Sequence, residues 1–266
     1  MKKIFLLAAF AFSILAVAAQ SNTTDEGVVI NGVKWATRNV DAPGTFAANP
    51  EDVGMLYQWN RKTGWSAAYP TVNSNGGTTW DGSSATGDTW ATSNDPSPAG
   101  WRVPTRGEIR ALLDTDDVSH VLVNVNGVNG MKCTDKSTNN SIFLPLTGWL
   151  HGSTGSSANY SDKSTNGNYW SSTQYGTSGS NLAYALFFRS TLTTSLDYTL
   201  RNYGFAVRSV ANTSSNHITD VKSNEEKTPV AYYSILGIQL QKEPESGMYI
   251  IVYDNGTIEK VVRQLR

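Results

Sequence analysis

Short apolar runs, separated by clusters of glycine, serine and asparagine, recur along most of this chain. From Gly27 to Val210 these runs have the length of β-strands, as in "SIFLPLTGWL" at 141–150 and "LAYALFF" at 182–188. Turn-forming residues at this spacing end a strand or a helix after a few residues. The chain is 39% hydrophobic and only 16% charged, which is typical of a globular domain and not of a disordered segment. The sequence therefore predicts many short strands and long loops.

One helix is predicted in the stretch "VPTRGEIRALLDTDD". Thr105 and Glu108 stand in the capping-box relation, in which the hydroxyl accepts from a first-turn amide and the carboxylate reaches back. Ile109, Leu112 and Leu113 follow as an apolar stripe at helical spacing. An acid at Glu108 could instead serve catalysis, but the cap accounts for it without any chemistry. We therefore expect a structural role for both capping residues.

The opening "MKKIFLLAAFAFSILAVAAQ" predicts a secretory signal peptide over residues 1–19. Lys2 and Lys3 precede an apolar run, which ends in small residues that suit signal-peptidase cleavage. A permanent membrane anchor is the alternative, but a spanning helix needs about 20 apolar residues and polar sequence begins at Gln20. We therefore expect a protein that is secreted or lies on the outer cell surface.

The net charge argues against a nucleic-acid-binding protein, and the cysteine content argues against a disulfide-bonded one. The formal charge is -1 at pH 7, so the chain has no broad basic surface that would attract a nucleic acid. Cys133 is the only cysteine, so an internal disulfide cannot form. A lone cysteine is more often a small buried hydrophobe than a nucleophile. We expect no nucleic-acid partner and a buried Cys133.

The composition changes after residue 211 and divides the mature chain into three parts. Residues 20–211 have the strand-and-turn texture of one domain. Residues 212–229 are polar and nearly free of aromatic side chains, which is typical of a solvated linker. Residues 230–266 return to strand-forming residues, with turns at "PESG" and "DNG". A short β-rich C-terminal unit is therefore expected.

Seven motifs in order give the first domain a family resemblance. They are "INGVKWATRNV", "GMLYQW", "PAGWRVPTRGEI", "LPLTGW", "GNYWSST", "AYALFF" and "YGFAVRSV", and they cover nearly all of residues 27–211. Together they resemble the Fibrobacter succinogenes major paralogous domain, a family widespread in secreted proteins of Bacteroidota.

Two of these motifs carry a second resemblance, which concerns the fold. "WRVPTRGE" and "GFAVRSV" are similar to signatures of the formylglycine-generating-enzyme branch of the C-type-lectin-like fold. This resemblance implies an α+β domain with small mixed or antiparallel sheets, few helices and long loops. It also implies a framework of Trp35, Trp101, Arg102, Pro104, Trp149, Trp170, Phe205 and Arg208.

The C-terminal block has a resemblance of its own. "YYSILGIQL", "SGMYIIVYDNG" and "IEKVVR" resemble the short sorting tail that type IX secretion recognises in Bacteroidota. The resemblance implies the outer-membrane secretion machinery as a partner of residues 230–266. A plain terminal β-unit is the alternative.

The signatures of several kinds of chemistry are missing from the sequence. A formylglycine-generating enzyme needs a pair of cysteines to hold copper, and only Cys133 is present. The histidines at 120, 151 and 217 lack the spacing of a zinc site, and the acidic run 114–117 lacks the pattern of an EF-hand loop. The calcium-lectin tripeptides "EPN", "QPD" and "WND", the nucleotide loops and the G-x-S-x-G elbow are also absent. We predict no catalytic residue, no metal and no cofactor.

Within the C-type-lectin-like resemblance, the segment from Tyr169 to Tyr203 is implied to supply the exposed binding face. It is rich in aromatic rings with polar tips and in side chains that adapt their hydrogen bonds, but alternate residues of any strand there must face the core. Loop positions are therefore favoured. The predicted ligand-binding residues are Tyr175, Asn181, Tyr198, Arg201 and Asn202, with Trp149 and His151 as neighbours.

The sequence predicts a secreted or cell-surface, non-catalytic binding or adhesion module that recognises a glycan or an extracellular protein. Two other functions stay open. An enzyme that acts on extracellular polysaccharide needs only two carboxylates across a cleft, which no sequence spacing excludes. A structural envelope protein would bind only neighbouring copies.

Overall fold

The computed structural model describes residues 23–212, 228–235, 238–253 and 258–263. It divides into two compact units, Met1–Asn212 and Thr213–Arg266. The predicted signal peptide, most of the predicted linker and His217 lie outside the described residues. None of the helices in the described part has the length and apolar character needed to cross a membrane.

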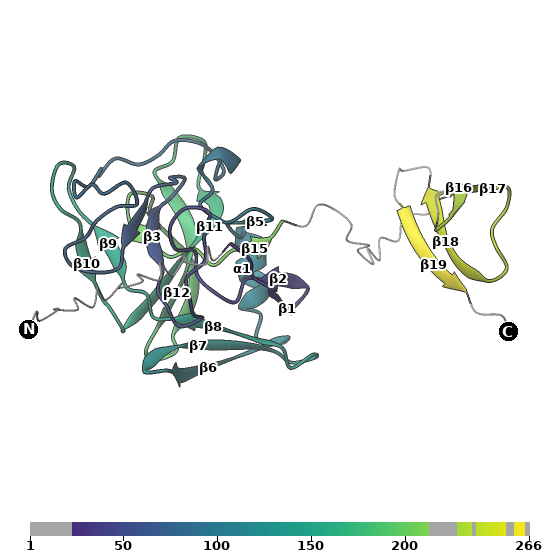
Figure 1. Ribbon diagram of the computed structural model, residues 1–266, viewed down its shortest axis with the longest axis horizontal. Coiled ribbons are helices and arrows are strands. Elements are labelled where there is room, and N and C mark those ends of the chain that lie inside the picture. Colours follow the sequence, from purple (N-terminus) through teal and green to yellow (C-terminus); the bar gives the residue numbers. More distant parts are fainter. Residues whose placement is uncertain (1–22, 213–227, 236–237, 254–257, 264–266) are drawn as a thin grey trace, which may run out of the picture. The chain divides into compact units, whose positions relative to one another are not determined.

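Short strands make up most of the regular structure of the first unit (Figure 1). The strands are β1 (Val28–Ile30), β2 (Val33–Trp35), β3 (Met55–Gln58), β4 (Gly64–Ser66), β5 (Trp101–Arg102), β6 (Val118–Val125), β7 (Val128–Asp135), β8 (Ser141–Pro145), β9 (Trp149–His151), β10 (Asn159–Ser161), β11 (Asn166–Tyr175), β12 (Leu182–Arg189), β13 (Thr194–Leu200), β14 (Gly204–Phe205) and β15 (Val210–Ala211). Helix α1 (Arg106–Leu112) and the 3-10 turn η1 (Thr92–Asn94) complete the regular structure within residues 23–212.

These strands form four small sheets, and every strand pairing in them is antiparallel. Their strand orders are β1-β2-β15-β5, β10-β9-β14-β3-β4, β11-β12-β13 and β6-β7-β8. The last strands of the unit lie in the middle of two sheets, because β14 pairs with both β3 and β9 and β15 pairs with both β2 and β5. The end of the unit thus joins segments that are far apart in the sequence.

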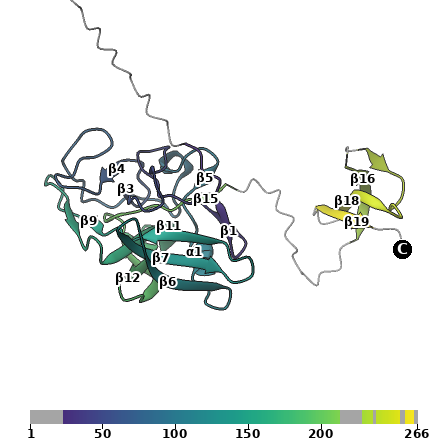
Figure 2. The same ribbon diagram turned by 60° about the horizontal axis from the view of Figure 1, so that its bottom comes forward.

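The predicted α+β class is wrong, and with it the C-type-lectin-like fold. The structure is mostly β, with several small antiparallel sheets and a single seven-residue α-helix among the described residues. Only the stretch around α1 has a helical apolar period, and turn residues interrupt the others before a helix can form. Figure 2 shows α1 beside β11, but no helix layer covers a sheet there. Antiparallel strands and loops surround the core instead.

The predicted capping box at α1 is confirmed. The Thr105 hydroxyl accepts a hydrogen bond from the Glu108 amide at 3.3 Å, and the Glu108 carboxylate accepts from the Thr105 amide at 2.7 Å. Arg102 also donates two hydrogen bonds to Glu108, at 2.8 and 2.6 Å. Burial raises the pKa of Glu108, but the bonds from Arg102 and Thr105 outweigh burial, so the pKa is lowered. Glu108 is therefore an ionised structural carboxylate.

Strand β12 is buried on both faces. Ala183 and Ala185 are fully buried on one face, and Leu186 and Phe188 are 2% and 1% exposed on the other. Small residues on one side allow the chain to approach Trp170, whereas the large residues fill the space near α1. The run "LAYALFF" is therefore scaffold at these four positions, whereas Leu182, Tyr184 and Phe187 are only half-buried.

Tryptophans dominate the two apolar clusters of the first unit. Trp35, Trp65 and Trp80 belong to one cluster, and Trp59, Trp90 and Trp170 to the other. Cys133 lies in the first cluster and is fully buried, as the sequence predicts. Burial raises the pKa of its thiol from 9.0 to about 12, so the thiolate is scarce at neutral pH.

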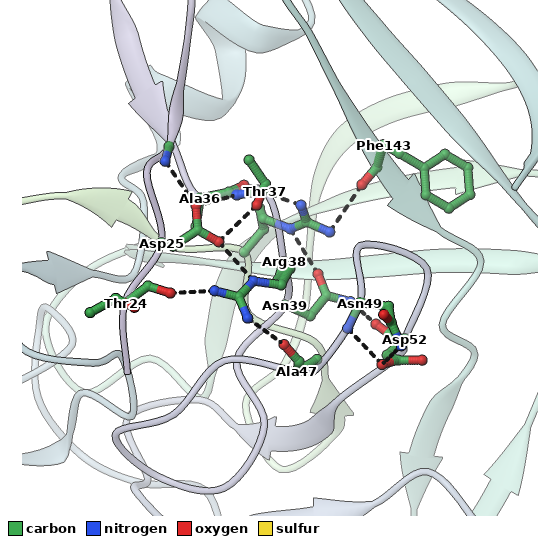
Figure 3. Close-up of polar contacts among 12 residues, drawn as sticks. Thr24, Asp25, Ala36, Thr37, Arg38, Asn39, Ala47, Asn49, Asp52 and Phe143 are labelled. Carbon is green, nitrogen blue, oxygen red and sulfur yellow. Dashed lines mark hydrogen bonds and ion pairs between the residues drawn. The ribbon is translucent and has the colours of Figure 1, made fainter. Parts of the chain in front are cut away.

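A buried polar network ties the N-terminal segment to the core (Figure 3). Arg208 is 1% exposed and donates to the Asn39 side chain at 2.9 Å, to the Ala36 carbonyl at 3.1 Å and to the Phe143 carbonyl at 3.0 Å. Asp25, whose side chain is fully buried, forms an ion pair with Arg38 at 3.1 Å. These side chains add to the backbone hydrogen bonds that join residues 36–40 to residues 207–209.

The second unit is a four-stranded antiparallel sheet in its described part. Its strands are β16 (Pro229–Ser234), β17 (Gln239–Leu240), β18 (Gly247–Tyr253) and β19 (Ile258–Arg263), in the order β17-β16-β18-β19. Tyr249 and Ile251 are 1% and 6% exposed, whereas Met248 on the opposite face of β18 is 48% exposed. The unit buries few side chains, as expected for so short a segment.

Candidate functional site

Five of the seven residues predicted to contact a ligand lie in three separate places. Tyr175 and Tyr198 stack on each other with ring centroids 3.6 Å apart, at one end of the sheet β11-β12-β13. Trp149 and His151 stack at 4.5 Å on β9. Asn181 is exposed in the turn before β12. The remaining two residues, Arg201 and Asn202, hold loops in place.

The structure corrects the expectation that Arg201 lies on the surface. Its side chain is 1% exposed and its guanidinium lies 4.0 Å from the ring centre of Trp59. It donates to the carbonyls of Leu182, Ala85 and Gly87 and to the Gln174 side chain, at 2.8 to 3.1 Å. These partners already occupy the guanidinium, so Arg201 positions the loop at 85–87.

Asn202 has a similar role on the neighbouring loop. Its side-chain amide donates to the Gly82 carbonyl at 2.7 Å, and its backbone carbonyl accepts from the Gln58 side chain at 3.0 Å. Asn202 therefore links the loop after Trp80 to Gln58 at the end of β3.

The tyrosine pair belongs to a cluster of three rings. Tyr175 also meets Tyr184 edge-on at 5.3 Å, and the Arg106 guanidinium lies 4.0 Å from the centre of the Tyr184 ring. Tyr198 is 43% exposed. Tyr184 lies directly opposite Tyr198 in the pairing of β12 with β13. The strand register therefore brings these rings together on the surface of the sheet.

A larger aromatic group lies around the buried ring of Phe205, and we call it the ring surface. Its members are Trp149, His151, Tyr203 and Phe187. Trp149 contacts His151 at 4.5 Å and Tyr203 at 4.8 Å, measured between ring centroids. Tyr203 and Phe187 both contact Phe205, at 6.4 and 5.7 Å. All four ring-surface residues are half-buried, so each keeps part of its ring accessible.

Strand alternation explains how two of these rings come to lie together. Trp149 and His151 are two residues apart on β9 and therefore share a face, whereas Leu150 between them is fully buried. The Trp149 indole donates to Asp162 at 2.9 Å, and His151 forms a hydrogen bond with the Ser161 hydroxyl at 3.0 Å. These bonds fix both rings before any ligand arrives.

A polar groove of about 540 Å³ continues from Phe187, and we call it the β12–β13 groove. Strand register places Phe187 opposite Ser195 and Asn168, and Arg189 opposite Asn166. Asn166 donates to the Asp162 oxygen that also accepts from Trp149, at 3.0 Å. The ring surface and the groove are therefore continuous.

A second hollow of about 590 Å³ borders the ring surface at the β9–β10 hairpin. His151, Asn159 and Lys163 line it together with Tyr69, whose side chain is 87% exposed. The accessible rings thus lie between two polar hollows. Stacking and hydrogen bonding are the chemistry that this arrangement offers.

Phe187 and Tyr203 are the two members of the ring surface that were not among the predicted ligand-binding residues. Alternation along β12 does place Phe187 opposite Tyr184, on the same face as Arg189. What the sequence does not contain is the proximity of β9 to β14, which brings Tyr203 beside Trp149.

No group of three or more His, Cys, Asp or Glu side chains that could hold a metal occurs among the residues that the structure describes. Asp41 and Asp52 line a separate hollow of about 370 Å³. Burial raises the pKa of Asp41, and the charge of Asp52 raises it further. A hydrogen bond from the Ala42 amide lowers this pKa but does not cancel the rise.

Comparison with known proteins gives one match. A family model described as a domain of unknown function (DUF8237) matches residues 132–210, less than half of the chain. No curated protein and no solved structure matches the chain. The matched segment contains all four residues of the ring surface, whereas Asp41 and Asp52 lie outside it.

Proposed function

We propose that the first unit is a non-catalytic binding module of a secreted or cell-surface protein and that its ring surface recognises a glycan. The observation that carries the proposal is the continuity of four accessible rings with the β12–β13 groove. The faces of sugar rings are apolar and stack on aromatic side chains, while their hydroxyls need amides, hydroxyls and charged groups near by. The family resemblance and the export signal support the same function.

The polar lining favours a glycan over an apolar protein partner. Asn166, Arg189, Ser195 and Asp197 can each donate or accept hydrogen bonds in the β12–β13 groove, and their charges are of both signs. A protein partner that docks through a hot spot needs a desolvated apolar pocket around its anchor. A neutral or weakly charged polyhydroxyl chain fits the groove better.

The β-rich second unit keeps its proposed role as a sorting tail. Its support is the resemblance of residues 230–266 to type IX sorting tails. The partner would then be the secretion machinery of the outer membrane, and glycan binding would not depend on this unit.

Replacement of Trp149 by alanine tests the glycan proposal. We expect glycan affinity to fall about thirtyfold, because loss of a central aromatic anchor costs about 2 kcal/mol. The purified protein is first applied to an array of glycans and glycoproteins, with and without a metal chelator, and the strongest glycan is then titrated by calorimetry. Tyr233→Ala is the control, since it removes a half-buried ring from the second unit, on which glycan binding does not depend in this proposal.

The control variant shows whether the ring surface or another part of the protein binds the glycan. Unchanged affinity in Trp149→Ala, or an equal loss in Tyr233→Ala with both variants folded, would remove the ring surface as the glycan site. Silence of the whole array would favour a protein partner or an envelope role.

A second candidate function is hydrolysis of extracellular polysaccharide. The specific observation in its favour is the hollow that Asp41 and Asp52 share, in which the raised pKa of Asp41 suits a general acid. If this reading is right, reducing sugar will appear when the protein is incubated with polysaccharide, and Asp41→Asn will lower the rate at least about a hundredfold. Without turnover in the wild type, this candidate falls.

A further inference from the structure

A third polar groove, which we call the loop groove, is formed by loops between β3 and β5. It has a volume of about 640 Å³. The side chains that line it are mostly amides, hydroxyls and charged groups. They include Gln58, Asn60, Arg61, Asn73, Asp81 and Asn94.

Hydrogen bonds to the end of β3 hold these loops in place. Gln58 donates to the Asp81 carbonyl at 2.6 Å. Asn60 accepts from the Ala91 amide at 2.8 Å and donates to the Thr86 carbonyl at 2.8 Å. Its backbone has a φ of 56°, a left-handed conformation that asparagine tolerates better than most residues. The groove is therefore largely formed before a ligand binds, which lowers the entropic cost of binding.

An ion pair forms part of the groove wall. Arg61 and Asp81 are 2.7 Å apart, and Arg61 also donates to the Ser83 carbonyl and hydroxyl at 3.1 and 2.8 Å. Asp81 accepts in turn from the Ser83 amide at 2.9 Å. Each charge is balanced by the other, yet both groups stay partly exposed, with side-chain exposures of 28% and 48%. Such a pair offers donors and acceptors side by side to a ligand without a net charge of its own.

We propose that the loop groove is a second saccharide site, which takes a neutral oligosaccharide through its hydroxyls. Adjacent hydroxyls of a sugar donate and accept at once, and the fixed amides of Asn73 and Asn94 together with the Arg61–Asp81 pair match that need. Lys62 is a further charged group of the lining, but amide side chains outnumber Arg61, Lys62 and Asp81 there. An apolar ligand would leave these amides unpaired.

The loop groove and the ring surface lie on opposite faces of one sheet. Leu150, Gly204 and Gln58 are in register across β9, β14 and β3, so they point to one face. Trp149 and His151, on either side of Leu150, point to the other. Gln58 lines the loop groove, and therefore the two sites are independent. The second site does not rest on the proposed ring-surface function, and together they would make the protein bivalent.

Calorimetric titration of the purified protein with cellohexaose, xylohexaose and mannohexaose tests this inference. Asp81→Asn is expected to weaken one class of sites about tenfold, since hydrogen bonds to charged groups contribute about 1.5–3 kcal/mol. Thr86→Trp, which places bulk at an exposed rim position, is the second variant and guards against a folding defect in the first. Arg110→Gln, on the exposed side of α1, is the control.

The Trp149→Ala background separates this inference from the ring-surface proposal. We expect one probe to bind still in Trp149→Ala, and this remaining binding to be lost when Asp81→Asn or Thr86→Trp is added. Loss of all binding in Trp149→Ala alone would overturn the second site and leave the ring surface standing. Binding that neither groove variant changes, or no binding of any probe to the wild type, would also overturn it.

Discussion

Replacement of Arg208 by methionine is expected to lower the free energy of unfolding of the first unit by about 3–5 kcal/mol. The guanidinium is fully desolvated and donates to three acceptors from two segments of the chain, the Asn39 side chain and the carbonyls of Ala36 and Phe143. Methionine fills a similar volume but leaves these acceptors without that partner. Burial lowers the pKa of Arg208, but a guanidinium is not deprotonated in proteins.

Equilibrium unfolding in urea, followed by tryptophan fluorescence, measures this effect. All eight tryptophans belong to residues 23–212, so the signal reports on the first unit alone. Arg208→Lys should give an intermediate loss, because an ammonium cannot reach three separate acceptors in the guanidinium geometry. The exposed Arg110→Gln should change stability by less than about 0.5 kcal/mol. An Arg208→Met midpoint equal to that of the wild type would show that the network is not stabilising.

Features that depend on neighbouring residues could be predicted from the sequence. The capping box needs only Thr105 and Glu108, three positions apart, and it forms as predicted. Strand alternation is equally local, and it places Trp149 and His151 on one face. The burial of Cys133 could be predicted because it is the only cysteine, and a lone cysteine is more often a small buried hydrophobe than a nucleophile.

Features that depend on pairing between segments far apart in the sequence could not be predicted. The fold class was inferred from motif resemblance, but the arrangement is set by contacts such as that of Val210 with Trp35 and Arg102, which no local pattern encodes. Arg201 reads as a surface loop residue because its neighbours are polar. It is buried because the carbonyls of Ala85 and Gly87, more than 110 positions away, converge on it.

Replacement of Asp25 by asparagine is expected to cost about 3 kcal/mol at neutral pH and nothing in strong acid. Asp25 accepts from the Gly27 amide at 2.8 Å, from the Thr37 amide and hydroxyl at 3.0 and 2.8 Å, and from Arg38 at 3.1 Å. Asparagine keeps the size but loses the charge and one acceptor oxygen, so Arg38 is left without its counterion. Figure 3 shows Thr37 and Arg38 directed at this carboxylate.

The pH dependence of this loss distinguishes a charge effect from a packing effect. Burial raises the pKa of Asp25, but the hydrogen bonds from Thr37, Gly27 and Arg38 outweigh burial and lower it below the ordinary 3.8. A lowered folded-state pKa means that the carboxylate stabilises the protein above pH 3.8 and stops doing so as the pH falls through the folded-state value. Urea unfolding of wild type and variant should therefore converge in acid, while Asp116→Asn, an exposed control, should match the wild type at every pH. A constant difference between wild type and Asp25→Asn across the acid range would assign the loss to packing and remove the ion pair with Arg38 as its cause.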